Sequence, residues 1–229
     1  MIMGWRSVVI THTAKLDYKM NYLVVRSGES VTRINIDEIA LLLIESTSVS
    51  LTAYLLYELS AHKVDVIFCD DKKNPDGMYV PFYGSHDTSR KVRIQTHWKD
   101  EAKENIWAAV VRQKILGQSA VLQANNHKDT SAMLTEYASQ VTTGDATNRE
   151  GFAAKVYFNS LFGKDFTRQD KENPINGQLN YGYAILLSAV CREIVSQGYL
   201  SQIGIHHENV FNEFNLACDL MEPFRPFID

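Results

Sequence analysis

The order of apolar and polar positions divides the chain into two parts of different character. In the first 83 residues, short β-branched and apolar runs alternate with turn residues, a pattern typical of strands. The expected strands cover residues 5–11, 22–26, 31–36, 39–44, 64–68 and 78–83. The pattern also predicts a helix over residues 51–60 with Ser50 as its N-cap, because a serine hydroxyl can accept a hydrogen bond from a free N–H group of the first turn.

From residue 99 onward, apolar residues recur at helical spacing. Two series with a spacing of four residues are Trp107, Val111 and Ile115, and Met133, Tyr137 and Val141. Residues 181–195 are apolar nearly all round, which is typical of a helix at the centre of a bundle, and Gly198 is expected to end that helix. The fold class is therefore expected to be α+β, with a small β-rich domain followed by an all-helical domain.

A polar and basic segment, residues 84–98, separates the two parts. This composition is typical of a linker or of an exposed segment at a domain boundary. We therefore predict an N-terminal β-rich domain over residues 1–83, a linker over 84–98 and a C-terminal helical domain over 99–229.

Composition excludes some classes of protein. With 229 residues, 45% of them apolar, the chain can bury one good core or two modest ones. We expect neither a signal peptide nor a membrane span, because no apolar run is long enough. The cysteines Cys69, Cys191 and Cys218 are far apart, which favours reduced thiols in a cytoplasmic protein over a zinc site. The net charge of −4 argues weakly against a nucleic-acid binder, although clustered basic residues would offset it.

One glutamate is out of keeping with the apolar face of a predicted helix. Asp145 is a good N-cap for this helix and Gly163 a good C-terminal stop. With about 3.6 residues per turn, one stripe contains Ala146, Glu150, Ala153, Ala154, Tyr157 and Leu161. Glu150 is either a functional carboxylate or a partner of Arg149 or Lys155 in a salt bridge, unless the helix buries its other face instead.

Two more acids lie in a mostly apolar run near the end of the sequence. Asp219 and Glu222 are three residues apart, so a helix would place both on one face. Burying carboxylates is costly unless a cation compensates them, and that cation would be Arg225 or a metal ion. His207 lies in the loop just before this helix, where a surface or capping role is the alternative. Taken jointly, several carboxylates and one imidazole suit Mg²⁺ or Mn²⁺ better than zinc, although structural ion pairs would use the same acids.

Five motifs occur in an order that is known from one family. They are Asn148-Arg-Glu150-Gly151, Asn173-Pro-Ile-Asn176, Leu179-Asn-Tyr-Gly-Tyr183, Gly204-Ile-His-His207 and Asp219-Leu-Met-Glu222-Pro-Phe-Arg-Pro226. Together they resemble the CRISPR-associated adaptation integrases, the spacer-acquisition nucleases of bacterial immunity. The opening Gly4-Trp5-Arg6 and the segment Cys69-Asp-Asp-Lys72 resemble the type II branch in particular. The resemblance extends over the whole chain and depends on the ordered set of motifs, since each of them alone is weak.

The resemblance implies roles for individual residues. It implies that Glu150, His207 and Glu222 are catalytic and hold a divalent metal ion, Mg²⁺ or Mn²⁺, in the helical domain. Asp219 is implied to be an auxiliary catalytic acid, and His206 a neighbour without a ligand role. The β-rich domain is implied to serve dimerisation.

The resemblance also implies an activity, which is the insertion of short foreign DNA fragments into a CRISPR array. A 3′-hydroxyl of the incoming DNA attacks a phosphodiester at the repeat boundary in a metal-dependent transesterification, and DNA endonuclease activity is implied as well. The implied partners are double-stranded DNA, a second copy of the chain in a homodimer, and a small CRISPR adaptation protein that bridges two dimers. Other type II adaptation proteins and the effector nuclease are further implied partners.

Binding energy for DNA has to come from outside an acidic site. Lys155, Lys164, Arg168 and Lys171 are candidates, but Asp165, Asp170 and Glu172 make a solvated charged loop an equal alternative. Arg225 would contact either phosphate or Asp219. Family members usually continue with further helical sequence, so a shortened C-terminus is expected, and a non-catalytic DNA-binding scaffold is one alternative function. The others are a general metal-dependent endonuclease and an α+β protein whose acids form structural ion pairs.

Overall fold

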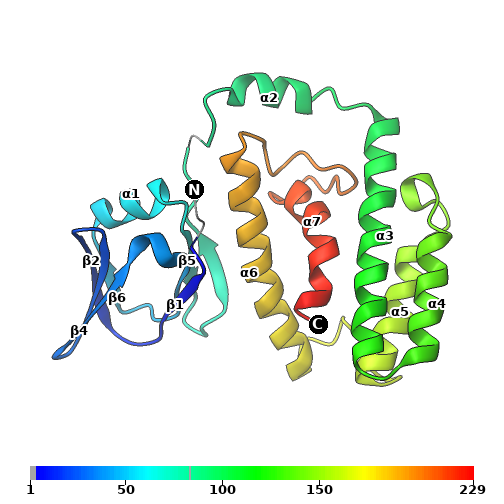
Figure 1. Ribbon diagram of the computed structural model, residues 1–229, viewed down its shortest axis with the longest axis horizontal. Coiled ribbons are helices and arrows are strands. Elements are labelled where there is room, and N and C mark those ends of the chain that lie inside the picture. Colours follow the sequence, from blue (N-terminus) through cyan, green and yellow to red (C-terminus); the bar gives the residue numbers. More distant parts are fainter. Residues whose placement is uncertain (1–3, 83) are drawn as a thin grey trace. The chain divides into compact units, whose positions relative to one another are not determined.

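The computed structural model describes residues 4–82 and 84–229, and the chain divides into two compact units, Met1–Phe82 and Tyr83–Asp229 (Figure 1). The described part of the first unit consists mainly of strands, and that of the second consists of helices. The expected α+β class is therefore confirmed.

The described residues of the first unit form two four-stranded sheets. In one sheet β1, β5 and β7 are parallel, and β8 pairs antiparallel with β7. In the other, β2 pairs with β6 in parallel and with β3 antiparallel, and β4 flanks β3. The strands are β1 Arg6–Ile10, β2 Ala14–Lys19, β3 Tyr22–Ser27, β4 Ser30–Asn35, β5 Ile39–Ile44, β6 Val49–Leu51, β7 Asp65–Cys69 and β8 Pro75–Met78. The unit also contains the 3-10 helix η1 Ile36–Glu38 and the helix α1 Ala53–Ala61.

One apolar core joins the two sheets and the helix of the first unit. Leu16 and Leu23 come from one sheet, Leu42 and Val66 from the other, and Leu55 from α1, and all five are fully buried. Each of these side chains contributes about 1.5–3 kcal/mol through the burial of apolar surface. The core therefore explains why short strands and a single helix form one compact unit.

Three details of this unit differ from the prediction. The pattern misses β2, which has three charged residues, and β6, which has only three residues. Thr52, rather than Ser50, caps α1, and its hydroxyl accepts a hydrogen bond from Leu55 N at 3.2 Å. The strand expected over 78–83 is instead β8 at Pro75–Met78, and residue 83 lies outside the described residues.

The second unit is arranged around α3, a helix of 25 residues. Its α-helices are α2 Thr88–Gln95, α3 Asp100–Ala124, α4 Lys128–Ser139, α5 Arg149–Phe162, α6 Pro174–Ser196 and α7 Asn215–Met221, and its 3-10 helices are η2 Thr143–Asp145 and η3 Glu222–Phe227. Helix α3 packs against α4, α5, α7 and η3, and α6 packs against α7 and η3 (Figure 1). The continuous segment α7–η3 therefore lies between α3 and α6, inside the unit.

The predicted buried face of α3 is confirmed, because Trp107, Val111 and Ile115 are all buried. On α4 the prediction is one residue off, since the buried apolar residues are Leu134 and Ala138 rather than Met133 and Tyr137. Val141, just after the helix, is buried as predicted. Two adjacent stripes on α4 fit the helical period, and packing against α3 selects the second. Helix α6 begins at Pro174, well before the predicted residue range, and its C-cap is followed by Gly198 with a φ of +81°.

The segment expected to be a linker contains the helix α2, which is attached to the second unit through Gln95. The buried side chain of Gln95 donates hydrogen bonds to the carbonyl oxygens of Leu200 and Ile203 at 2.8 and 3.0 Å, and accepts one from Leu200 N at 2.9 Å.

The three cysteines are free thiols. In the described part of the chain, no helix combines the length and the apolar character that crossing a membrane requires.

Candidate active site

Two side chains that precede α5 hold its first turn. Asp145 accepts hydrogen bonds from the backbone N–H groups of Arg149 and Glu150, both at 2.9 Å. The N-cap is Asn148 rather than the predicted Asp145, and its side chain accepts a hydrogen bond from Gly151 N at 3.2 Å. A Cβ at residue 151 would lie 2.7 Å from Asn148 Oδ1, so only glycine leaves room for this cap. The Asn-Arg-Glu-Gly motif therefore positions Glu150 at the start of the helix.

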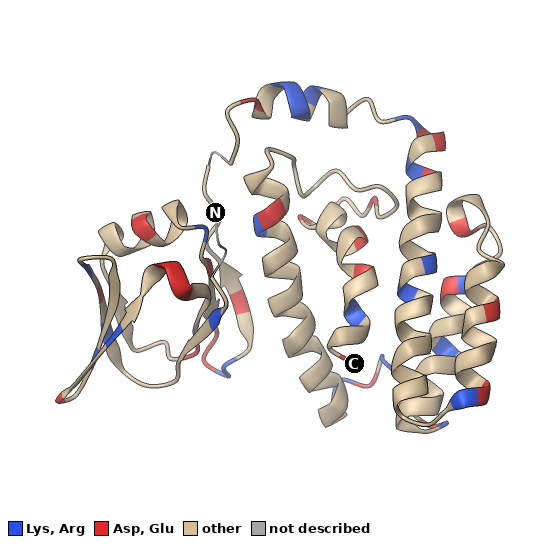
Figure 2. Ribbon diagram, in the orientation of Figure 1, with Lys and Arg blue, Asp and Glu red and all other residues tan. Residues whose placement is uncertain are grey.

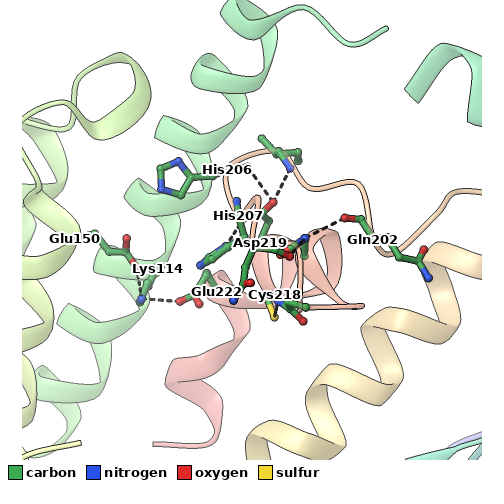
Figure 3. A network of polar contacts seen from close by, with 12 residues as sticks. Lys114, Glu150, Gln202, His206, His207, Cys218, Asp219 and Glu222 are labelled. Carbon is green, nitrogen blue, oxygen red and sulfur yellow. Dashed lines mark hydrogen bonds and ion pairs between the residues drawn. The ribbon is translucent and has the colours of Figure 1, made fainter. Parts of the chain in front are cut away.

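Glu150 forms an ion pair with a lysine on a neighbouring helix. Its Oε1 lies 2.6 Å from Nζ of Lys114 on α3, and the same Nζ lies 2.5 Å from Oε2 of Glu222 (Figure 3). The other oxygen of Glu222, Oε1, lies 2.9 Å from Nε of Arg225. Carboxylates from α5 and η3 thus meet at one ammonium group on α3.

Lys114 is a site residue that the sequence analysis misses. The alternatives considered for Glu150 lay within its own helix, whereas Lys114 is far from it in the sequence and only 9% exposed. Burial disfavours the charged lysine, but the carboxylates of Glu222 and Glu150 outweigh burial and raise the pKa of Lys114 above its ordinary value. A signal was available, because Lys114 follows Val111 by three residues and so falls on the apolar stripe of α3.

Asp219 is fully buried and organises the Gly-x-x-His loop. Its Oδ2 accepts hydrogen bonds from Ile205 N and His206 N at 2.6 and 3.0 Å, and its Oδ1 accepts one from His207 N at 3.1 Å. A Cβ on Gly204 would lie 2.2 Å from the His207 carbonyl oxygen, which explains the glycine. Burial alone would raise the pKa of Asp219, but the hydrogen bonds from His207 and the loop amides lower it below its ordinary value.

The same carboxylate orients the His207 ring. Nδ1 of His207 donates a hydrogen bond to Asp219 Oδ1 at 2.6 Å, which leaves Nε2 as the nitrogen that can act as a ligand. This hydrogen bond raises the pKa of His207; burial opposes the effect, and the nearby glutamates add to it. His206 has a different environment, because it stacks on the Trp107 ring with a centroid separation of 4.1 Å.

Arg225 is the cation considered for the two acids of this segment, and it contacts Glu222 rather than Asp219. It pairs with Glu222, and its guanidinium lies over the Tyr183 ring, 4.6 Å from the centroid. The hydroxyl of Tyr183 in turn donates a hydrogen bond to Asp229. Arg225 therefore links the acidic site to helix α6.

The structure brings the four predicted site residues into one region as two pairs (Figure 3). Glu150 and Glu222 meet through Lys114, and His207 is bound to Asp219. Across residues 4–82 and 84–229, no group of three or more His, Cys, Asp or Glu side chains has the spacing to hold a metal ion. The donor set nevertheless fits a divalent ion chemically, since two carboxylates already share one cation and the imidazole is fixed by a carboxylate.

The fold and the site together define an α+β protein whose helical unit contains an acidic, charge-compensated site built from α3, α5, α7–η3 and the loop before α7. The protein family described as "CRISPR associated protein Cas1" matches residues 7–229. The chain therefore belongs to the Cas1 family, as the motifs predicted. It is 37% identical over 228 residues to the CRISPR-associated endonuclease Cas1 of Neisseria meningitidis serogroup C (strain 8013), which covers 99% of this chain and 74% of that protein. This similarity agrees with the type II branch.

Two solved structures have a similar fold. A casposase bound to integration product superimposes with a TM-score of 0.76 at 23% identity, covering 98% of this chain and 70% of that chain. A Cas6-RT-Cas1–Cas2 complex gives a TM-score of 0.70 at 21% identity, covering 100% of this chain and 27% of that chain. At these identities the likeness is one of fold.

Proposed function

We propose that this chain is a CRISPR adaptation integrase that inserts short DNA fragments into a CRISPR array. The main observation behind the proposal is that Glu150 and Glu222, which come from two separate motifs, both contact the ammonium group of Lys114. The chain that brings them together is a member of the Cas1 family. A relative named an endonuclease and the similar fold of a casposase bound to integration product support it.

The proposed reaction is a transesterification. The 3′-hydroxyl oxygen of the incoming DNA forms a bond to phosphorus, the bond from that phosphorus to the leaving 3′-oxygen breaks, and the hydroxyl proton is transferred to the leaving oxygen. Glu150, His207 and Glu222 are proposed to hold Mg²⁺ or Mn²⁺, which neutralises phosphate charge and acidifies the attacking hydroxyl when bound. The chain itself keeps these donors in place, because Asp145 holds the start of α5 and Asp219 holds His207.

The acidity of the site affects how substrate binds. Glu150, Glu222 and Asp219 repel a phosphodiester unless cations balance their charge. Lys114 and Arg225 provide part of that balance, since both contact Glu222. We therefore expect DNA to bind mainly through residues outside the site and to react only when divalent ions are present.

The joining of DNA ends tests the proposed function and separates it from the alternatives. The purified chain is incubated with a short duplex that has free 3′-hydroxyl ends and with a second duplex that carries a CRISPR repeat, with Mn²⁺ or with a chelator. We expect covalent joining that the chelator abolishes. Cleavage without joining would instead identify a general endonuclease, and DNA binding without either reaction a non-catalytic scaffold. An absence of all three would favour structural ion pairs.

The helix α2 is the surface that we propose for DNA binding. Residues 88–99 contain four Lys or Arg residues and no acid, and Figure 2 shows basic residues on α2. Arg90, Arg93 and Lys99 are exposed and line an open groove together with Trp98. Basic side chains neutralise backbone phosphates and an aromatic ring can stack on an unpaired base, so this combination suits a DNA end.

Of the basic residues that follow Glu150 in the sequence, Arg168 is the one less suitable for DNA binding. The guanidinium of Arg168 donates hydrogen bonds to Oδ1 of Asn176 and of Asn180 at 2.5 and 2.7 Å, and it lies over the Tyr183 ring. Its role in the unit is therefore structural. The remaining candidates are exposed, and they are Lys155, Lys164 and Lys171.

Neutralising two charges of the α2 surface is expected to weaken DNA binding without changing its sequence preference. We expect the double variant Arg93→Gln/Lys99→Gln to bind duplexes about 10-fold more weakly near physiological salt, with a salt dependence of log K reduced by roughly 1 for each lost phosphate contact. Lys128→Gln, at an exposed position of α4, is the matched control. Fluorescence anisotropy at several salt concentrations measures both quantities. Equal affinity and an equal slope in the double variant would remove α2 from the DNA-binding surface.

We further propose that the first unit mediates a homodimer and that a small CRISPR adaptation protein bridges two dimers. The similarity to a Cas6-RT-Cas1–Cas2 complex supports the second part. Tyr54 and Tyr57 of α1 are exposed and stacked, with centroids 6.0 Å apart, and offer aromatic surface in the first unit. A light-scattering mass of twice 26.0 kDa would support the dimer, and a monomeric mass would contradict it.

A further inference from the structure

Lys114 lies at the centre of the acidic site, although none of the five motifs contains it. Its Nζ contacts Glu150 and Glu222 at the same time, at 2.6 and 2.5 Å. The lysine is 9% exposed and Glu222 is 5% exposed, so water can do little to screen these charges. With 28% of the Glu150 side chain exposed, the arrangement is a largely enclosed ion triad and not a surface salt bridge.

A triad of this kind needs a cation to balance its two carboxylates. Two carboxylates that face each other repel unless a cation lies between them. The structure supplies that cation from α3, a helix that the predicted ligand set does not include. A divalent ion held by Glu150 and Glu222 would use the same two carboxylates and would be repelled by an ammonium group so close to it. Lys114 and the metal ion therefore compete for the two glutamates.

We propose that Lys114 is a built-in counter-cation, which keeps Glu150 and Glu222 together in the metal-free protein and is displaced from at least one of them when Mg²⁺ or Mn²⁺ binds. This inference rests on the proposed function, because it uses the same two glutamates. Lys114 is a positioning residue, since it acts through those side chains. Its long methylene stem lets Nζ move while the backbone of α3 stays in place.

The proposal predicts two effects of opposite sign when the charge is removed. Without Lys114 the glutamates repel each other, so the metal-free protein becomes less stable. The metal ion no longer competes with an ammonium group, so it binds more tightly. A lysine with a merely structural role would change stability without strengthening metal binding.

Lys114→Met tests both effects, because methionine keeps a long unbranched side chain and removes the charge. By isothermal titration calorimetry we expect Mn²⁺ to bind the variant about 10-fold more tightly than the wild type. We expect the melting temperature to fall by several degrees in chelator and to recover with saturating Mn²⁺. Lys128→Met is the control, because Lys128 is an exposed lysine on α4 of the same unit, and the Mn²⁺ affinity of this variant should equal that of the wild type.

Mn²⁺ affinity of Lys114→Met that is equal to or weaker than that of the wild type would overturn the proposal. If Lys114→Met does not fold, Lys114→Gln and a wild-type structure with bound Mn²⁺ decide the question. The structure is expected to show Nζ away from at least one glutamate, and retention of both contacts beside a bound ion would contradict displacement. Failure of the wild type to bind Mn²⁺, or binding that Glu150→Gln and Glu222→Gln leave unchanged, would overturn the metal assignment of the proposed function together with this inference.

Discussion

Replacing Glu150 by glutamine is expected to lower the rate of DNA-end joining by at least about 10³-fold while the fold is retained. The amide has nearly the shape of the carboxylate but lacks the charge that holds a hard divalent ion. The start of α5 should persist, because Asp145 binds the backbone of residue 150 and not its side chain. Lys114 keeps Glu222 as a partner. We therefore expect the free energy of unfolding to fall by only about 1–2 kcal/mol.

The control for this variant is Glu136→Gln, the same chemical change on α4 of the same unit. Glu136 is exposed and accepts a hydrogen bond from Gln140 at 3.0 Å, so its replacement should leave joining unchanged. Single-turnover joining with Mn²⁺ and thermal melts measured by circular dichroism give the two quantities. Joining at a near wild-type rate by the Glu150→Gln protein would show that Glu150 is not part of the active site.

Replacing Asp219 by asparagine is expected to cause the largest loss of stability. The carboxylate is fully buried and accepts three backbone hydrogen bonds and one from His207 Nδ1. Asparagine has one acceptor oxygen, and its NH₂ group would face N–H donors of the loop, leaving some of them unpaired in the interior. We expect the free energy of unfolding to fall by about 3–5 kcal/mol and the melting temperature by roughly 10 °C.

The same substitution should also weaken metal binding, because His207 loses the group that fixes its ring. We expect Mn²⁺ affinity to fall by about 10–100-fold. Asp100→Asn is the control, since that side chain is 91% exposed and its replacement should change stability by less than about 0.5 kcal/mol. Urea unfolding and calorimetry measure the two effects. An Asp219→Asn protein as stable as the control would mean that contacts other than Asp219 hold the loop.

Much of the fold could be predicted because its signals are local. The change from short β-branched and apolar runs to helical spacing marks the two parts of the chain, and the buried face of α3 follows from the spacing of its apolar residues. The predictions are wrong where two local alternatives fit the sequence equally well and tertiary contacts determine which one forms. Two adjacent stripes of α4 fit the helical period, and two hydroxyl residues precede α1, so only packing and cap geometry decide between them.

The sequence alone does not explain why two of the motifs contain a glycine. Gly151 and Gly204 stand out only as members of family motifs. In the structure a Cβ on Gly151 would meet Asn148, and a Cβ on Gly204 would meet the His207 carbonyl. In both places another atom of the chain lies too close to the glycine for a Cβ to fit. Such close contacts exist only once the chain is folded.

By itself the sequence determined the α+β class through its local patterning. It indicated the Cas1 family and the acidic residues of the site through the resemblance of its ordered motifs. Only the tertiary structure decided which charges meet. Lys114 lies between Glu150 and Glu222, and Asp219 binds His207, because α3, α5 and α7–η3 pack together and bring residues from distant parts of the sequence within hydrogen-bond distance. An ion pair or a hydrogen bond forms only when its two atoms lie within a few ångströms of each other, so these contacts depend on packing and cannot be inferred from separation along the chain.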